Sequence, residues 1–239
     1  MKCCVLGLGY IGLPTAAILA NNGHEVLGID INEEVIKTLN SGQVHISEPG
    51  LDNLVKINIE SEQLIVSKKI EKSDVFLITV PTPFKNEIHN GIPIPDISYV
   101  INAVNSICKV IKENDLIILE STSPVGTTEE IAKLIFKNTG LNTERVHIAY
   151  CPERVIPGNI LFELVQNHRV VGGLTEEASE KAKIFYSTFC NGNIDITETR
   201  VAELVKLSEN TFRDINIAFA NELSMICDEL DINPLEVIK

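Results

Sequence analysis

The sequence predicts an α/β fold in which a mostly parallel β-sheet, covered by helices on both faces, is followed by one long helix. Three observations support this prediction. Short apolar runs alternate with segments of helical periodicity over residues 1–197, as in parallel sheets whose strands are joined by helices. A glycine-rich turn joins the first strand to the first helix. From residue 199 onward, about thirty residues contain neither glycine nor proline, which is typical of an uninterrupted helix.

The expected strands are short and apolar, and most are followed by a segment with helical periodicity. The first strand occupies residues 2–8 and the first helix residues 11–22. The other strands are expected at residues 25–30, 74–80, 115–120, 146–150, 169–171 and 193–196. The other helices of this region are expected at residues 33–41, 97–110, 128–138 and 175–188. This order predicts a doubly wound sheet.

Polar and proline residues indicate several element boundaries. Asp96 is a good N-cap for the helix over residues 97–110. Glu129 and Glu130 fall in the first turn of the helix over residues 128–138, where the helix dipole favours anions. Residues 81–95 contain four prolines and are therefore predicted to form a loop at a strand end.

The long helix is predicted to connect domains or subunits. We place a cofactor-binding domain at residues 1–197, a central helix at 198–231 and the start of a further segment at 232–239. At 1.5 Å per residue the helix is roughly 45 Å long, which is more than one small sheet needs. One side of it is apolar and consists of Leu204, Leu207, Ile215, Phe219, Leu223, Ile226 and Leu230. Pro234 begins a new helix close to Lys239, which we expect to be a truncation point.

Composition excludes several classes of function. The chain has 239 residues, of which 44% are apolar and 22% charged, as in ordinary globular proteins. The net charge of −13 argues against general binding to nucleic acid or anionic membranes, because both require a cationic surface. No apolar run approaches the roughly 18 residues that a transmembrane helix needs, and the N-terminus does not resemble a signal peptide. The six cysteines lack disulfide-scaffold spacing, so we expect reduced thiols and a cytoplasmic protein.

The glycine-rich turn has the pattern of a dinucleotide-binding site. Gly7, Gly9 and Gly12 form G-x-G-x-x-G between a strand and a helix, and Asp30 ends the next strand. In this Rossmann-like arrangement the first glycine permits the tight turn, the second lets the pyrophosphate approach the backbone, and the third permits close helix packing. The acidic residue binds the ribose hydroxyls and repels a 2′-phosphate, which favours NAD over NADP.

Five segments spread along the chain carry a family resemblance. They are GLGYIGLPT at residues 7–15, VPTPF at 80–84, ESTSPVGTT at 120–128, YCPERVIPG at 150–158 and KLSENTFRDINIAFANEL at 206–223. Together they resemble the UDP-glucose/GDP-mannose dehydrogenase family over essentially the whole chain. Within this family the pattern is most similar to the members that act on UDP-N-acetyl-D-mannosamine.

The resemblance implies a four-electron oxidation. Members of the family oxidise the C6 alcohol of a nucleotide-sugar to a carboxylate by two hydride transfers to NAD, through a thioester on a cysteine. The substrate implied here is UDP-N-acetyl-D-mannosamine or a related nucleotide-sugar, and the uronate product would feed polysaccharide synthesis. The family cysteine lies in a Gly-Gly-x-Cys segment that this chain does not contain. We therefore expect the chain alone to bind NAD but to turn over little substrate.

The resemblance also implies a homodimer, in which the long helix packs against its mate, and it implies residue roles. The family's NAD contacts correspond, besides the glycines, to Tyr10, Ile11, Asp30, Thr82 and Thr122. Glu153 is expected to handle a water or a proton, and Arg154 and Val155 to contact substrate.

On the long helix, the resemblance implies that Lys206 donates or accepts a proton and stabilises the developing oxyanion together with Asn210. Arg213 is expected to hold the nucleotide-sugar, since its guanidinium suits phosphate. These three residues are spaced by four and three, so they share a helix face opposite the apolar side.

Several features leave alternatives open. UDP-glucose dehydrogenases have a second glutamate where this chain has Pro157, so the group that activates the hydrolytic water is not identified. Cys151 is expected to be a packing residue, and the five histidines form no cluster that would predict a metal site. A β-hydroxyacid dehydrogenase also joins a dinucleotide-binding domain to a helix with Lys-x-x-x-Asn, although without the Pro-Glu-Arg segment. A non-catalytic NAD-binding module is the third alternative, if 239 residues is the natural length.

Overall fold

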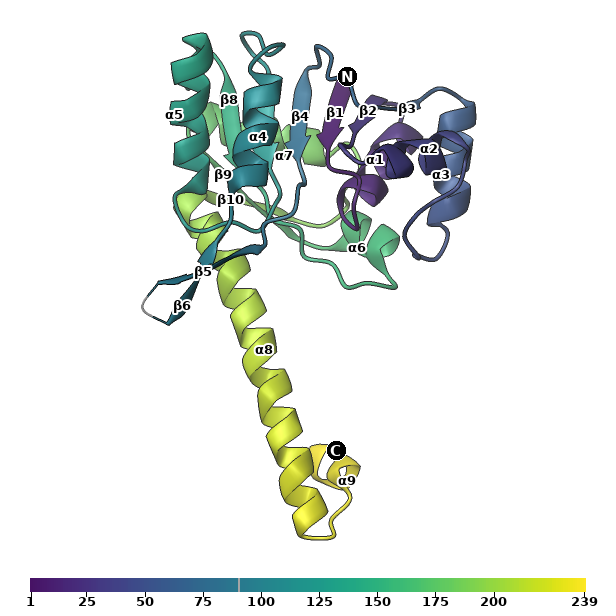
Figure 1. Cartoon of the computed structure of the whole chain (residues 1–239), viewed down its shortest axis with the longest axis vertical. Helices are drawn as coiled ribbons and strands as arrows, with labels where there is room; N and C mark the ends of the chain where they lie inside the picture. The colour runs from purple at the N-terminus through teal and green to yellow at the C-terminus, as the bar shows by residue number, and fades with distance from the viewer. Residues whose placement is uncertain (90) are drawn as a thin grey trace.

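The computed structural model describes residues 1–89 and 91–239, and its centre is an eight-stranded sheet (Figure 1). The strand order is β10-β9-β8-β7-β4-β1-β2-β3. The six strands from β8 to β3 are parallel, whereas β9 pairs with β8 in the antiparallel direction and β10 runs parallel to β9. The strands are β1 (Lys2–Leu6), β2 (Glu25–Ile29), β3 (Leu64–Ser67), β4 (Val75–Ile78), β7 (Leu116–Leu119), β8 (His147–Tyr150), β9 (Arg169–Gly173) and β10 (Ile194–Glu198).

Helices cover both faces of the sheet. The bounds are α1 (Gly12–Asn21), α2 (Glu33–Asn40), α3 (Leu51–Glu60), α4 (Ser98–Ile107), α5 (Thr127–Thr139), α6 (Ile160–Gln166) and α7 (Glu176–Tyr186). Alternate residues of β1 enter opposite cores, because successive strand side chains point to opposite faces. Cys3 and Val5 pack with residues of α1, α3, α6 and α7. Cys4 and Leu6 pack with residues of α4, α5 and the start of α8 (Thr199–Glu229).

These elements confirm the predicted α/β fold with its mostly parallel sheet. Each predicted strand and helix of residues 1–197 is present, with ends that differ by a few residues. The helix expected from residue 97 begins at Ser98, whose N–H donates to the Asp96 carboxylate at 2.9 Å. Besides the hairpin described below, three elements were not predicted, namely α3, β3 and α6. β3 has four residues and α6 seven, so their periodicity is weak, whereas α3 has ten residues and its length does not explain the miss.

The prediction of a loop over residues 81–95 was wrong for most of that segment. It forms a two-stranded antiparallel hairpin, β5 (Phe84–His89) and β6 (Ile92–Pro95) (Figure 1). Residue 90 lies outside the described residues. Prolines are compatible with this hairpin because each of its strands is paired on one side only, so the missing N–H groups need no partner in a further strand.

Helix α8 leaves the sheet domain after its first two turns and projects away from it (Figure 1). Its buried residues near the domain are Thr199, Ala202, Glu203 and Lys206. The Glu203 carboxylate accepts the N–H groups of Gly126 at 2.6 Å and Thr128 at 2.9 Å, at the beginning of α5. A buried carboxylate at a helix N-terminus satisfies free donors and complements the helix dipole. Glu203 thereby ties α8 to the sheet domain.

At the far end of α8 the chain turns into α9 (Pro234–Ile238). The Asn233 side chain caps this helix by accepting the Leu235 N–H at 3.0 Å, and a proline begins it, as predicted. None of the helices formed by the described residues combines the length and apolar character that a bilayer crossing requires.

Candidate active site

The glycine turn is held in the geometry that the motif requires. Gly7 has a φ of +94°, a conformation that strongly favours glycine. A Cβ atom on Gly12 would lie 1.8 Å from the Gly7 carbonyl oxygen and 2.4 Å from the Thr79 hydroxyl. A Cβ on Gly9 would meet nothing within 4 Å, so this glycine faces open space. Gly7 and Gly12 therefore build the turn, whereas Gly9 keeps its surface clear for a ligand.

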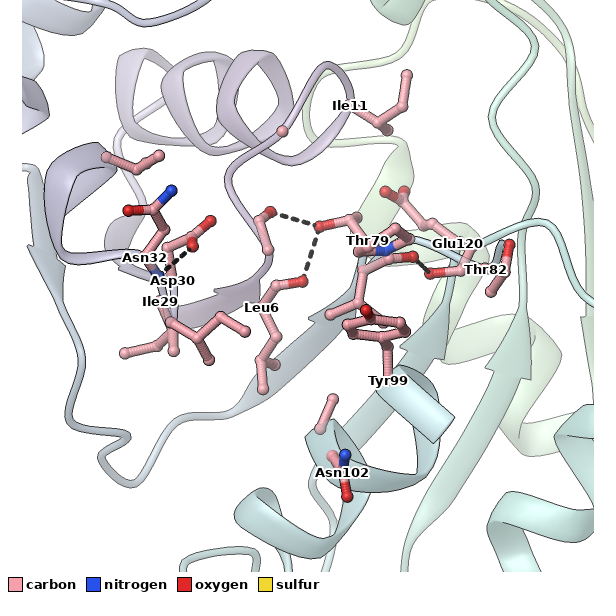
Figure 2. Close-up of a pocket in the computed structure, with 18 of the residues that line it drawn as sticks. Leu6, Ile11, Ile29, Asp30, Asn32, Thr79, Thr82, Tyr99, Asn102 and Glu120 are labelled. Carbon is pink, nitrogen blue, oxygen red and sulfur yellow. Dashed lines mark hydrogen bonds between the residues drawn. The ribbon is translucent and has the colours of Figure 1, made fainter. Parts of the chain in front are cut away.

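The start of α1 is open to an anion. Its N-cap residue, Ile11, makes no side-chain capping hydrogen bond. The Leu13 N–H donates to the Gly9 carbonyl oxygen at 3.1 Å and Pro14 has no N–H, so the Gly12 N–H is the donor left for an anion at the positive end of the helix dipole. The Thr79 hydroxyl fixes this turn against β4, because it lies 2.9 and 2.8 Å from the carbonyl oxygens of Leu6 and Gly7 (Figure 2).

Asp30 is oriented by the backbone around it. Its Oδ2 atom accepts the Leu8 N–H at 2.9 Å, and its Oδ1 atom accepts the Asn32 N–H at 2.9 Å. Each carboxylate oxygen keeps a further lone pair for a ligand hydroxyl. Asp30 lies at one end of the cavity, and Thr82 and Glu120 lie at the other (Figure 2). This arrangement matches a ribose-binding carboxylate far from the reacting end of a dinucleotide.

The cavity at the carboxyl ends of the strands has a volume of about 780 Å³, within the range of small-molecule sites. It brings together most of the predicted cofactor residues, namely Gly7, Gly9, Tyr10, Ile11, Asp30, Thr82 and Thr122. The Thr82 hydroxyl donates to the Thr122 carbonyl oxygen at 2.6 Å and so joins the loops after β4 and β7. A bound dinucleotide fits the volume of the cavity, the N-terminus of α1 and the acidic side chain of Asp30.

Helix α4 contributes a wall of this cavity that was not predicted. Tyr99, Asn102 and Ser106 line it, together with Ala103. Tyr99 and Asn102 project from α4 below the strand ends (Figure 2). The spacing of three and four places these residues on one helix face. That spacing was visible in the sequence, but it did not indicate whether this face meets the solvent, the core or a ligand.

Glu153 connects the cavity to α8. It follows β8, lines the cavity and binds Lys206, whose Nζ atom lies 2.9 Å from the Glu153 Oε1 atom and 2.7 Å from the Glu153 carbonyl oxygen. The two side chains are only 16% and 7% exposed. The other carboxylate oxygen of Glu153 accepts the Val155 N–H at 2.9 Å. A nearly buried acid and ammonium in contact can exchange and direct protons at the end of the cavity that lies opposite Asp30.

Arg154 has a partner that was not predicted. Its Nε atom donates to the Glu209 Oε2 atom at 2.9 Å, and its Nη2 atom contacts the Glu209 Oε1 atom. Its Nη1 atom donates to the His168 carbonyl oxygen at 3.3 Å. Such a forked ion pair fixes the plane of the guanidinium. The only sequence signal for Glu209 was its position three residues after Lys206.

The remaining predicted substrate residues differ in their exposure. Val155 is buried next to Glu153. Asn210 and Arg213 are exposed on α8 beyond the point where the helix leaves the domain. Within residues 1–89 and 91–239, neither side chain forms a hydrogen bond or an ion pair. The structure therefore places Glu153 at the cavity with Lys206 bound to it, and leaves Asn210 and Arg213 on a separate, open surface.

A buried cluster adjoins the cavity at Glu120, which lines it. The Tyr186 hydroxyl donates to the Glu120 carboxylate at 2.6 Å, and the Arg169 guanidinium lies 4.0 Å from the same oxygen and over the Tyr186 ring. Burial raises the pKa of the Glu120 carboxyl, and the charge of Arg169 opposes this shift. Burial also raises the pKa of the Cys151 thiol to about 11, again opposed by Arg169. A fully buried thiol that stays protonated supports the predicted packing role of Cys151.

The described part of the chain contains no group of three or more His, Cys, Asp or Glu side chains that could hold a metal ion.

Comparison with known proteins identifies relatives of the whole chain. Residues 1–190 match the NAD binding domain of the UDP-glucose/GDP-mannose dehydrogenase family, and residues 200–239 match its central domain. A UDP-N-acetyl-D-mannosamine dehydrogenase from Campylobacter jejuni is 48% identical over 100% of this chain and 60% of its own length. An NDP-N-acetyl-D-galactosaminuronic acid dehydrogenase from Ralstonia nicotianae is 47% identical over 98% of this chain and 56% of its own.

The solved structure of a UDP-D-ManNAc dehydrogenase from Pyrococcus horikoshii superposes with a TM-score of 0.94 at 43% identity. It covers 100% of this chain and 56% of the archaeal one. The chain thus spans between half and two thirds of the length of these relatives.

Proposed function

The chain belongs to the UDP-glucose/GDP-mannose dehydrogenase family, and we propose that it is the cofactor-binding part of an NAD-dependent UDP-N-acetyl-D-mannosamine 6-dehydrogenase. The reaction is the oxidation of the C6 alcohol to the uronate. The relatives at 47–48% identity are named for different sugars, but both names describe an N-acetylated amino sugar. A nucleotide-activated 2-acetamido sugar is therefore the substrate class that these relatives support.

The observation that carries this proposal is the pairing of Lys206 with Glu153 at the end of the dinucleotide cavity that lies opposite Asp30. Bound NAD supplies the acceptor for the hydride that leaves C6. The substrate hydroxyl must lose a proton in the same step, and Lys206, held by Glu153, is placed to direct that proton. Its ammonium is also a strong donor to an alkoxide at C6.

The other site residues have roles in the same proposal. Gly7, Gly9, Tyr10, Ile11, Gly12, Asp30, Thr82 and Thr122 bind or shape the site for NAD. Asn210 helps Lys206 to stabilise the oxyanion, Arg154 and Val155 contact the sugar, and Arg213 holds the diphosphate. In this proposal the family cysteine and the second half of the nucleotide-sugar site correspond to the part of the relatives that this chain does not cover.

We also propose that the enzyme is a cytoplasmic homodimer formed through α8. All six cysteines in the structure are free thiols, as in reducing compartments. Beyond Arg213, α8 exposes a row of large apolar side chains to solvent, namely Ile215, Phe219, Ile226 and Leu230. A contiguous exposed apolar surface on a helix supports an interface with another chain.

The test is the stoichiometry of the reaction in the full-length enzyme. Incubation of UDP-N-acetyl-D-mannosamine with excess NAD is expected to yield two NADH per sugar, measured at 340 nm, and the uronate, measured by mass spectrometry. One NADH per substrate would instead indicate a single hydride transfer, as in a β-hydroxyacid dehydrogenase. NADH binding without any turnover of nucleotide-sugars would favour a non-catalytic module.

A further inference from the structure

Two ion pairs join the loop after β8 to helix α8, and their polarities are opposite. Glu153 of the loop binds Lys206 of the helix, and the next loop residue, Arg154, binds Glu209 of the helix. The helix partners are three residues apart, which places them on neighbouring positions of one face. The two ion pairs therefore lie next to each other along α8.

The two pairs differ in how open they are. Glu153 and Lys206 are 16% and 7% exposed, whereas Arg154 and Glu209 are 32% and 34% exposed. A guanidinium has five N–H groups, of which Arg154 uses one on Nε, one on Nη2 and one on Nη1. Each oxygen of Glu209 accepts one hydrogen bond from Arg154 and can accept another. The Arg154–Glu209 pair therefore offers a free donor and a free acceptor side by side.

The position of this pair fits a sugar ring whose C6 reacts at Lys206. Three residues of helix correspond to about 4.5 Å along its axis. This is comparable to the width of a pyranose ring. Helix α8 runs away from the sheet domain (Figure 1), and Glu153 lines the cofactor cavity whereas neither Arg154 nor Glu209 does, so the second pair lies outward of the first. A hexose with C6 at the cavity must extend its remaining substituents in that outward direction.

The charge state of the pair favours a neutral ligand group. The Arg154 charge is already balanced by Glu209 through a forked contact, so the guanidinium is a poor partner for a diphosphate. Arg213, one helical turn beyond Glu209, has no acidic partner among the residues that the structure describes. A phosphate would therefore bind preferentially at Arg213, and an uncharged polar group at the Arg154–Glu209 pair.

We propose that the Arg154–Glu209 pair recognises the acetamido group of the substrate: Glu209 accepts a hydrogen bond from its N–H, and Arg154 donates one to its carbonyl oxygen. A secondary amide has one donor and one acceptor on different atoms, which match the two free positions of the pair. A hydroxyl group at the same carbon offers a single oxygen and does not span both. Glu209 is thus a specificity-determining residue, and this assignment depends on the proposed function.

The experiment compares two ligands on the full-length enzyme with NADH bound, so that no hydride transfer takes place. Dissociation constants for UDP-N-acetylmannosamine and for UDP-mannose, its C2-hydroxy counterpart, are measured by calorimetry. In Glu209→Gln the constant for UDP-N-acetylmannosamine is expected to rise about 10- to 100-fold, the usual effect of losing a charged hydrogen-bond partner. The constant for UDP-mannose is expected to change less than about threefold, so equal changes for both ligands would overturn the assignment.

Two further variants separate recognition from structural support. The double exchange Arg154→Glu with Glu209→Arg keeps an ion pair between the loop and the helix but reverses the donor and the acceptor. Recovery of UDP-N-acetylmannosamine affinity in this variant would mean that the pair only holds the loop, and would contradict the proposal. Glu163→Gln is the matched control, because Glu163 accepts the Ile156 N–H of the same loop from α6. This control variant is expected to raise the dissociation constants of both ligands by the same factor.

The result also distinguishes failure of the inference from failure of the proposed function. A wild-type enzyme that neither binds nor oxidises UDP-N-acetylmannosamine, but acts on a 2-hydroxy sugar nucleotide, contradicts the function itself. A wild-type enzyme that oxidises UDP-N-acetylmannosamine while Glu209→Gln leaves the ratio of the two dissociation constants unchanged contradicts only the role of the pair. The NADH dissociation constant of each variant is expected to match wild type, and this shows that the cofactor domain is folded.

Discussion

The cofactor side and the substrate side of the site are built in different ways. The cofactor side is formed by main-chain features of the sheet domain, such as the turn at Gly7, the free N-terminus of α1 and the backbone-held Asp30. The substrate side is formed by side chains from the loop after β8 and from α8, which meet as ion pairs. The first side is enclosed within this chain, whereas the second opens onto the exposed surface at Asn210 and Arg213. Binding of cofactor and turnover of substrate should therefore be separable by mutation.

The largest expected effect is on turnover alone. Lys206→Ala in the full-length enzyme is expected to lower kcat by about 10³-fold, the usual scale for a general acid or base. The NADH dissociation constant, measured by fluorescence, should remain within about twofold, because Lys206 does not line the dinucleotide cavity. Lys137→Ala on the exposed face of α5 is the control and should change neither quantity. A Lys206→Ala enzyme with near wild-type kcat would remove this residue from the chemistry.

The second prediction concerns the cofactor side and can be tested on this chain. Gly12→Ala places a Cβ atom 1.8 Å from the Gly7 carbonyl oxygen, so the turn must shift, and NADH affinity is expected to fall by more than about 100-fold. Gly9→Ala meets no neighbouring atom and should unfold at the wild-type temperature. It should still raise the NADH dissociation constant about tenfold, because the added methyl group lies where the pyrophosphate approaches the backbone. Equal melting temperatures for both variants would contradict this division of roles.

The third prediction concerns the exposed apolar row on α8. Phe219→Asp in the full-length enzyme is expected to weaken a homodimer by about 100-fold or more, because a symmetric interface loses a buried aromatic side chain twice. Sedimentation velocity across a concentration series measures this change. The melting temperature of the sheet domain should be unaffected, since Phe219 lies outside both of its cores. An unchanged dimer dissociation constant in this variant would mean that the interface lies elsewhere.

The fourth prediction concerns the choice of cofactor. Asp30→Asn removes the charge that repels a 2′-phosphate but keeps a polar side chain beside the ribose. NAD is expected to bind about tenfold more weakly, since a hydrogen bond to a charged group is lost. NADP should lose less affinity or gain some. The ratio of the two dissociation constants, rather than either constant alone, tests the assignment.

The smallest expected effect is at Cys151. Its pKa is raised by burial from 9.0 to about 11, so the thiol is protonated at neutral pH and a poor nucleophile. Cys151→Ala is therefore expected to leave kcat within about threefold of wild type, since only packing is lost. Because the unfolded thiol ionises first, the stability linked to this group is present below pH 9 and is lost as the pH rises towards 11. The variant should show a shallower alkaline loss of stability than wild type.

The sequence predictions were accurate where the signal comes from residues that are close together in the chain. The glycine turn and Asp30 were predicted because their roles follow from residues within one strand–turn–helix unit and the next strand. The hairpin over residues 84–95 was not predicted, because prolines argue against strands in a sheet interior but not in a two-stranded ribbon. The face of α4 that lines the cavity was also missed, since its periodicity is equally compatible with a solvent-facing side.

The substrate side shows why residue roles could not be read from spacing. Lys206, Asn210 and Arg213 share a helix face in the sequence, but only Lys206 is buried, because α8 leaves the domain just after it. The partner of Arg154 lies 55 residues away in the chain. No pattern within the loop identifies Glu209, since their contact depends on where α8 packs against the strand ends.

By itself the sequence determined the alternation of strands and helices, the dinucleotide turn, the length of α8 and the family. These properties follow from local periodicity, from glycines that the backbone geometry requires and from motifs of adjacent residues. Only the tertiary structure decided which charged side chains face each other and which helix face is covered. The physical reason is that ion pairs such as Arg154–Glu209 form between segments far apart in the chain. Their geometry is set by packing of the sheet against α8, which no local preference encodes.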